Sequence, residues 1–161
     1  ALSLLKVPTL KRDLGQGLVR EIHKLVLNAQ ELLPSNTGAN LTHGDFDPSN
    51  IKVKIHDGLW KISGILDWEF AFAGTFYSDI GQMIRYSHKL PISFEAAFIN
   101  GIREGGLELP PSWKQRAKLM DLLSLLKLGA SNPYRVRPRL NSDVKELIET
   151  TVECWESFFG N

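Results

Sequence analysis

The stretch from Thr42 to Asn50, with the sequence Thr-His-Gly-Asp-Phe-Asp-Pro-Ser-Asn, limits most strongly what this chain can fold into. It has neither helical nor strand periodicity, and Pro48 favours a loop because its ring fixes φ and removes a backbone donor. Asp45 and Asn50 lie in this loop, and Asp67 follows later at the end of an apolar run. Phosphoryl transfer from a magnesium nucleotide requires three oxygen-bearing side chains of this kind. One carboxylate accepts the proton of the attacking hydroxyl, while an amide oxygen and a second carboxylate hold Mg²⁺.

A β-hairpin is predicted between Asn50 and Asp67. Residues 51–55 alternate apolar and basic side chains, which is typical of a half-buried strand. Asp57-Gly58 is a strong signal for a tight turn, and residues 59–66 then return as the second strand. We therefore expect the hairpin to bring Asp67 back towards Asn50.

The segments His-Gly-Asp-Phe-Asp-Pro-Ser-Asn and Ile-Leu-Asp-Trp-Glu resemble the aminoglycoside phosphotransferase and choline kinase family, which shares its fold with the protein kinases. In protein kinases the corresponding pattern is H-R-D-x-x-x-x-N followed by D-F-G. The resemblance implies that Asp45 is the catalytic base and that Asn50 and Asp67 bind the metal. It also implies Mg²⁺ and ATP as cofactors, with GTP as an open alternative. The implied substrate is a hydroxyl-bearing small molecule such as an aminoglycoside, a choline-like amine alcohol or a sugar.

Several neighbouring residues are candidates for supporting the site. His43 has three interpretations, as a base, as a metal ligand or as a packed structural residue, and the resemblance implies that it supports the loop structurally. Asp47 is a competing carboxylate, but an Asp before a proline more often caps its own turn. The resemblance gives Asp79 the role of accepting hydrogen bonds from the catalytic-loop backbone; the alternative is an ordinary acid at a helix start.

Other residues are assigned with less support from the sequence. Glu69 approaches either a second metal ion or the substrate in one interpretation, and is simply solvated in the other. Leu66 and Lys52 are candidates for contact with the nucleotide. Lys52 departs from the family pattern, because the family commonly has an apolar residue there, beneath the adenine ring.

Periodicity elsewhere predicts a mostly helical α+β fold, which the resemblance makes the C-terminal lobe of the protein-kinase-like fold, with a small β-hairpin carrying the catalytic and metal-binding loops. The first ten residues are expected to be a loop, and Ser78-Asp79 is expected to start a helix. A helix from about 112 to 128 is apolar nearly all round, which indicates a central buried position. Further elements are predicted over 13–33 (helix), 39–42 (strand), 92–104 (helix) and 142–158 (helix).

We expect residues 1–161 to form a single domain. The sequence contains no glycine-rich strand-turn-strand and no strand lysine of the kind that binds nucleotide phosphates, so the N-terminal nucleotide-clamping lobe is expected to be absent. A missing N-terminal lobe or another partner would then cover the exposed lobe interface, and self-association is expected without it. The alternative to a kinase lobe is a degenerate, non-catalytic module that binds a ligand or a protein. A metal hydrolase built on His43 and Asp45 has too few ligands to be favoured.

Composition excludes some partners. With 19 basic and 18 acidic residues the formal charge is +1, which offers no electrostatic reason to expect nucleic acid or a membrane surface. The single cysteine, Cys154, cannot form an internal disulfide and fits a reducing compartment. A cytoplasmic location is therefore expected.

Overall fold

The computed structural model describes residues 2–34 and 39–158. The chain groups into two compact units: unit 1 consists of Ala1–Pro34 and Leu109–Asn161, and unit 2 is Ser35–Glu108. Helices predominate, and the strands form two small two-stranded sheets. The predicted mostly helical α+β class is therefore confirmed. The grouping does not decide whether the units belong to one domain, so the single domain stays a prediction.

Unit 1 is helical in its described part. Its first ten residues were expected to form a loop, but Pro8 begins a helix, since proline at the first helical position loses no hydrogen bond. The helix predicted over 13–33 is interrupted at Gly15, whose φ of +83° ends one helix and precedes the next. The elements are η1 (Leu4–Lys6), α1 (Pro8–Leu14), α2 (Gln16–Asn28), η2 (Gln30–Leu32), α5 (Trp113–Ser131), α6 (Pro138–Glu153) and η6 (Trp155–Phe158).

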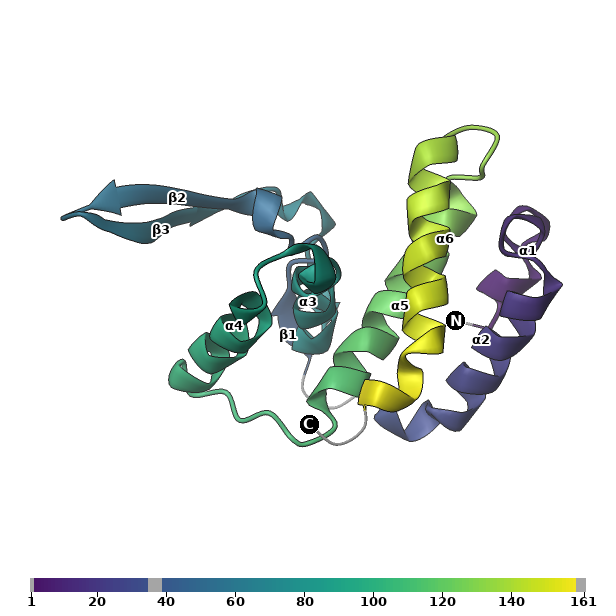
Figure 1. Cartoon of the computed structure of the whole chain (residues 1–161), viewed down its shortest axis with the longest axis horizontal. Helices are drawn as coiled ribbons and strands as arrows, with labels where there is room; N and C mark the ends of the chain where they lie inside the picture. The colour runs from purple at the N-terminus through teal and green to yellow at the C-terminus, as the bar shows by residue number, and fades with distance from the viewer. Residues whose placement is uncertain (1, 35–38, 159–161) are drawn as a thin grey trace. The chain divides into compact units, whose positions relative to one another are not determined.

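Helix α5 is the centre of unit 1, as its apolar sequence predicted. It packs against α1 and α6, and α6 also contacts α2 (Figure 1). Buried side chains occur on every side of α5, which is why the sequence has no polar stripe there. The largest fully buried apolar side chains of the unit are Leu10, Ile22, Leu119, Leu122, Leu125, Leu126 and Ile148.

Unit 2 carries all the strands found in the described chain. The predicted strand at 39–42 and the predicted hairpin are present, and β2 pairs antiparallel with β3. Strand β4 was not predicted; it pairs with β1 so that Thr42 lies opposite Phe72. The elements are β1 (Asn40–Thr42), η3 (Pro48–Asn50), β2 (Ile51–His56), β3 (Leu59–Ile65), η4 (Trp68–Phe70), β4 (Phe72–Gly74), α3 (Phe76–Met83), η5 (Ser87–Lys89) and α4 (Ser93–Glu104).

The β2–β3 hairpin turns where the sequence predicted, because Asp57 and Gly58 both adopt positive φ, at 54° and 73°. Figure 1 shows the hairpin as a ribbon whose tip lies away from the rest of unit 2. The expectation of half-buried strands is wrong, since almost every hairpin residue is exposed. One face is apolar, with its side chains paired across the strands as Val53 with Ile62 and Ile55 with Trp60, and these four are 49–72% exposed.

Helix α3 begins earlier than predicted. The expected start was Ser78-Asp79, whereas the residue that caps the helix is Thr75, whose hydroxyl accepts the Tyr77 N–H at 3.4 Å. Asp79 therefore lies inside the first turn, on a helix whose buried residues include Ile80 and Met83. Across the described chain, we find no helix that combines the length and the apolar character needed to span a membrane.

Candidate active site

Gly44 shapes the loop that carries Asp45. Its φ is +82°, a conformation that side chains rarely adopt. A Cβ added there would lie 2.4 Å from the backbone oxygen of Phe70. Glycine is therefore required twice, by the backbone conformation and by the close approach of η4. This explains why the motif places glycine directly before the candidate base.

His43 connects the Asp45 loop to the segment that precedes Asp67. The side chain is only 2% exposed. Its Nδ1 accepts the Asp45 N–H at 3.3 Å, so the ring proton lies on Nε2, which donates to the backbone oxygen of Leu66 at 2.8 Å. The Trp68 ring packs with its centroid 4.5 Å from that of the His43 ring. Backbone groups therefore bind both ring nitrogens of His43, which is the arrangement expected of a residue that supports the loop structurally.

Asp79 fixes the start of the same loop from helix α3. Its two carboxylate oxygens accept the backbone N–H groups of His43 at 2.8 Å and Gly44 at 3.0 Å. Hydrogen bonds to a carboxylate are stronger than those between neutral groups. The loop is therefore tied to the first turn of α3 by two such bonds.

Gln82 also holds the loop, and sequence analysis missed it. Its Oε1 accepts the Phe46 N–H at 2.9 Å and its Nε2 donates to the Gly44 oxygen at 2.7 Å. The residue lies one turn after Asp79, so both side chains point from the same face of α3. A polar residue between the buried positions of that helix was the available signal.

Asn50 lies beside Asp45. Its Nδ2 donates to the Asp45 backbone oxygen at 2.9 Å and to Asp45 Oδ2 at 3.3 Å. Because the amide nitrogen is used in this way, Asn50 Oδ1 remains, and we find no donor to it within the described residues. Asp47 caps the short η3 helix by accepting the Ser49 N–H at 2.8 Å, which confirms its interpretation as a turn residue.

Asp67 is brought next to Asn50 through the backbone. The Leu66 N–H donates to the backbone oxygen of Asn50 at 2.9 Å, and Ile51 lies opposite Ile65 at this end of the hairpin. Asp67 itself has φ 68° and ψ 54°, the left-handed conformation. Its side chain is exposed, and it has no hydrogen bond or ion pair among the described residues. The arrangement leaves one carboxylate and one amide oxygen available from adjacent segments.

The side chains of the remaining candidates lie outside this hydrogen-bonded network. Lys52 is exposed on β2 opposite Gly64, next to an irregularity in the strand pairing. Leu66 is half exposed and joins the network through its backbone groups. Glu69 is exposed on η4, and we find no polar side-chain contact for it in the described chain. The structure therefore brings together Asp45, Asn50, His43 and Asp79, and places Asp67 beside them.

The Asn50 amide oxygen and the Asp67 carboxylate are oxygen donors, the ligand type that Mg²⁺ takes in proteins. Within the described residues there is no group of three or more His, Cys, Asp or Glu side chains that could hold a metal. Mg²⁺ does not require such a group in a nucleotide site, because it keeps several waters and takes its other ligands from the phosphates. One carboxylate and one amide oxygen, both without other partners in the described chain, are therefore a suitable protein contribution.

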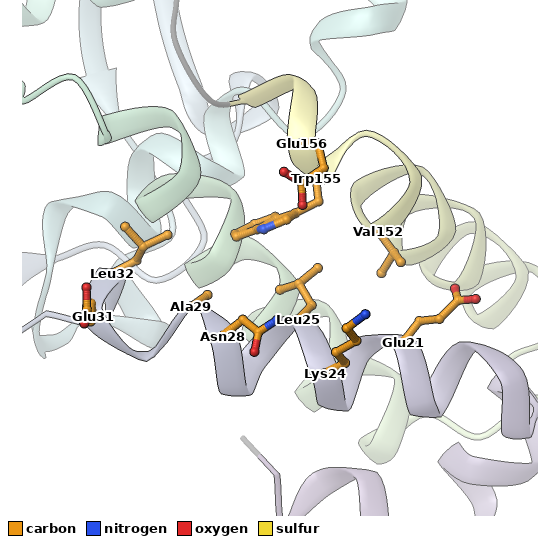
Figure 2. A pocket seen from close by; sticks show the side chains of 10 residues that line it. All are labelled: Glu21, Lys24, Leu25, Asn28, Ala29, Glu31, Leu32, Val152, Trp155 and Glu156. Atoms are coloured by element: carbon orange, nitrogen blue, oxygen red, sulfur yellow. The ribbon is translucent and has the colours of Figure 1, made fainter.

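A separate cavity of about 400 Å³ lies in unit 1 and contains none of the candidate residues (Figure 2). Trp155 and Leu25 contribute apolar lining, and three glutamates, Glu21, Glu31 and Glu156, contribute negative charge. The cavity is thus distinct from the hydrogen-bonded network around Asp45.

Comparison with known proteins identifies the class. The model of the phosphotransferase enzyme family, APH, matches residues 4–117, which is more than half of the chain and includes every candidate residue described above. The chain therefore belongs to this phosphotransferase family, as its two motifs predicted. Searches of curated proteins and of solved structures returned no significant match.

Proposed function

We propose that this chain is the C-terminal lobe of an ATP- and Mg²⁺-dependent phosphotransferase that phosphorylates a hydroxyl group of a small molecule. An aminoglycoside, a choline-like amine alcohol or a sugar is the proposed substrate class. Family membership supports phosphotransfer in general. The observation that carries the proposal is the hydrogen bonding of Asn50 Nδ2 to Asp45, which orients the base and leaves Asn50 Oδ1 for a metal.

Each residue has a distinct role in this proposal. Asp45 orients the substrate hydroxyl and accepts its proton. Asn50 Oδ1 and the Asp67 carboxylate hold Mg²⁺, which when bound neutralises charge on the phosphates. His43 and Asp79 keep the Asp45 loop in position. Glu69 is a candidate for contact with the substrate.

Leu66 and Lys52 are the proposed contacts to the nucleotide base. Leu66 is apolar and half exposed, which suits packing against a purine ring. Lys52 is charged, which departs from the family pattern. Both ATP and GTP are therefore candidate nucleotides for this site. Competition between the two nucleotides in one binding assay distinguishes them.

The experiment that tests the proposal is calorimetric titration with Mg²⁺-ATP. Asp67→Asn and Asp57→Asn form a matched pair, because both are exposed aspartates with positive φ, which asparagine tolerates. We expect Asp67→Asn to weaken Mg²⁺-ATP binding at least tenfold and Asp57→Asn to leave it unchanged. Equal binding by the two variants would refute the metal-binding role of Asp67. Absence of binding by the wild type would refute nucleotide binding by this chain alone.

A non-catalytic binding module is the second candidate, and the exposed apolar hairpin face favours it. A partner, either an N-terminal lobe or another protein, would cover Val53, Ile55, Trp60 and Ile62. Asp45→Asn separates the two candidates. If the chain is a catalyst, this variant loses turnover more than Mg²⁺-ATP binding. If the wild type binds Mg²⁺-ATP but consumes none with any hydroxyl compound offered, the module is favoured.

A further inference from the structure

We infer that Gln82 is a positioning residue for Asp45. Its carboxamide bonds the backbone on both sides of the aspartate: the Phe46 N–H after it, at 2.9 Å, and the Gly44 oxygen before it, at 2.7 Å. The Gln82 carboxamide thus donates one hydrogen bond and accepts another, as a backbone peptide group does when two strands pair. The inference rests on the proposed function only in giving Asp45 the role of the base.

Side chains bind every main-chain polar group adjacent to the Asp45 side chain. Asp79 accepts the Gly44 N–H, and His43 accepts the N–H of Asp45 itself. Asn50 donates to the Asp45 oxygen. Only the Gly44 oxygen and the Phe46 N–H then remain, and Gln82 binds both. Without Gln82 each of the two peptide units that join Asp45 to its neighbours would lose one of its two hydrogen bonds and keep only the bond to His43 or to Asn50.

The chemistry of a carboxamide is required at this point. The Gly44 oxygen needs a donor and the Phe46 N–H needs an acceptor, and an amide supplies one of each in a single plane. Gln82 is only 7% exposed, so water is poorly placed to replace it. Methionine keeps the length of the side chain but removes both bonds. Ionised glutamate keeps an acceptor for Phe46 but presents a second oxygen to the Gly44 carbonyl.

The effect on Asp45 follows from its position between the two bonded peptides. With one of its two hydrogen bonds removed, either peptide could tilt, which would tilt the Cα–Cβ bond of Asp45 and move its carboxylate. A misplacement of about 1 Å can cost on the order of 100-fold in rate. Substitution of Gln82 should therefore lower kcat while leaving the KM for nucleotide nearly unchanged, because Gln82 bonds Gly44 and Phe46 and neither Asn50 nor Asp67.

The test uses the full chain with Gln82→Met, Gln82→Glu and the control Gln115→Met. Gln115 is a buried glutamine of α5 whose Oε1 has no hydrogen-bond partner among the described residues, so the control removes a buried amide without releasing the loop. The first measurement is amide hydrogen exchange by NMR. We expect the Phe46 amide to exchange at least tenfold faster in Gln82→Met, and at the wild-type rate in Gln115→Met.

The second measurement is steady-state hydrolysis of Mg²⁺-ATP, with water as the acceptor of the phosphoryl group. We expect kcat to fall at least tenfold in Gln82→Met, with less than a twofold change in KM. Gln82→Glu provides conservative rescue, because a protonated carboxyl can donate to the Gly44 oxygen and accept from Phe46. Burial disfavours the charged carboxylate, so the ratio of the Gln82→Glu kcat to that of the wild type should rise as the pH is lowered.

The outcomes separate this inference from the proposed function. Unchanged exchange of the Phe46 amide in Gln82→Met overturns the inference, whatever the activity. Faster exchange with unchanged kcat also overturns it, because the loop would then be released without affecting the base. If neither the wild type nor any variant hydrolyses ATP, the failure belongs to the proposed function, and the exchange rates alone decide whether Gln82 holds the loop.

Discussion

Replacement of Asp79 by asparagine tests whether α3 holds the Asp45 loop in place. Both oxygens of Asp79 accept backbone N–H groups, from His43 and Gly44. Asparagine has nearly the same shape but only one oxygen, so its NH₂ group must face one of the two backbone donors. One charge-assisted bond is lost, a second becomes neutral, and a donor is left without an acceptor.

The expected cost follows from these losses. A hydrogen bond to a charged group contributes about 1.5–3 kcal/mol, and a buried donor left unsatisfied costs about 1–3 kcal/mol. Asp79 also lies in the first turn of α3, where a negative charge contributes about 0.3–1 kcal/mol. Since these contributions overlap, we expect a loss of about 2–4 kcal/mol. For a chain of this size, that corresponds to a decrease in Tm of roughly 5–15 °C.

Thermal unfolding followed by circular dichroism measures the change. Glu146→Gln is the control, because Glu146 is exposed on α6 and its substitution removes the same charge. The control should shift Tm by less than 2 °C, in line with about 0.5 kcal/mol for a surface change. If Asp79→Asn shifts Tm no more than Glu146→Gln does, the two carboxylate bonds contribute nothing to stability, and the argument that α3 holds the loop is wrong.

Three further predictions concern other parts of the chain. Gly44→Ala should destabilise the protein by more than about 2 kcal/mol, and Gly58→Ala by only about 1 kcal/mol, because both have positive φ but only Gly44 faces an atom too close for a Cβ. Burial raises the pKa of the Asp13 carboxyl. The Tyr134 N–H and the neighbouring arginines lower this pKa by more than burial raises it, so the net effect is a lowered pKa. Asp13→Asn should therefore be less stable than the wild type at pH 7, with the difference disappearing as the pH falls below about 4. The exposed hairpin face should cause concentration-dependent self-association, which Trp60→Lys should reduce.

Each of these has a contrary result. Equal unfolding free energies for the two glycine variants would show that the close contact at Gly44 relaxes without cost. A difference between Asp13→Asn and the wild type that does not shrink as the pH is lowered from 7 would contradict the lowered pKa, since stability from a lowered carboxyl pKa is lost as the pH falls through that pKa. A clean monomer of the wild type in equilibrium sedimentation at high concentration would contradict self-association.

The parts of unit 2 that the sequence predicted are those determined by neighbouring residues. The turn at Asp57-Gly58 requires positive φ at both positions, and the sequence supplies two residues that tolerate it. Asp47 before Pro48 indicated a capped turn, because an Asp side chain can accept the backbone N–H two residues further on, as it does from Ser49. The proximity of Asn50 and Asp67 followed from the hairpin, because the second strand of a regular hairpin returns the chain to the start of the first.

The parts that were missed depend on residues distant in sequence. Strand β4 exists through its pairing with β1, and nothing in Phe72–Gly74 alone indicates a strand. The bonds of Gln82 to Gly44 and Phe46 join positions separated by more than 35 residues. The exposure of Val53 was likewise unpredictable, because an alternating pattern shows which face is apolar but not whether another element covers it.

The pairing of β1 with β4 has a consequence for how the gene could vary. The strand directly before His43 pairs with the strand that leads into α3. The two ends of the segment between these strands are therefore held together independently of its length. The hairpin tip at Asp57-Gly58 is exposed and remote from those fixed ends (Figure 1). Extra codons at this tip should therefore lengthen the ribbon without moving Asn50 or Asp67. A peptide tag or fluorescent label inserted there would report on the protein while leaving its chemistry unaltered.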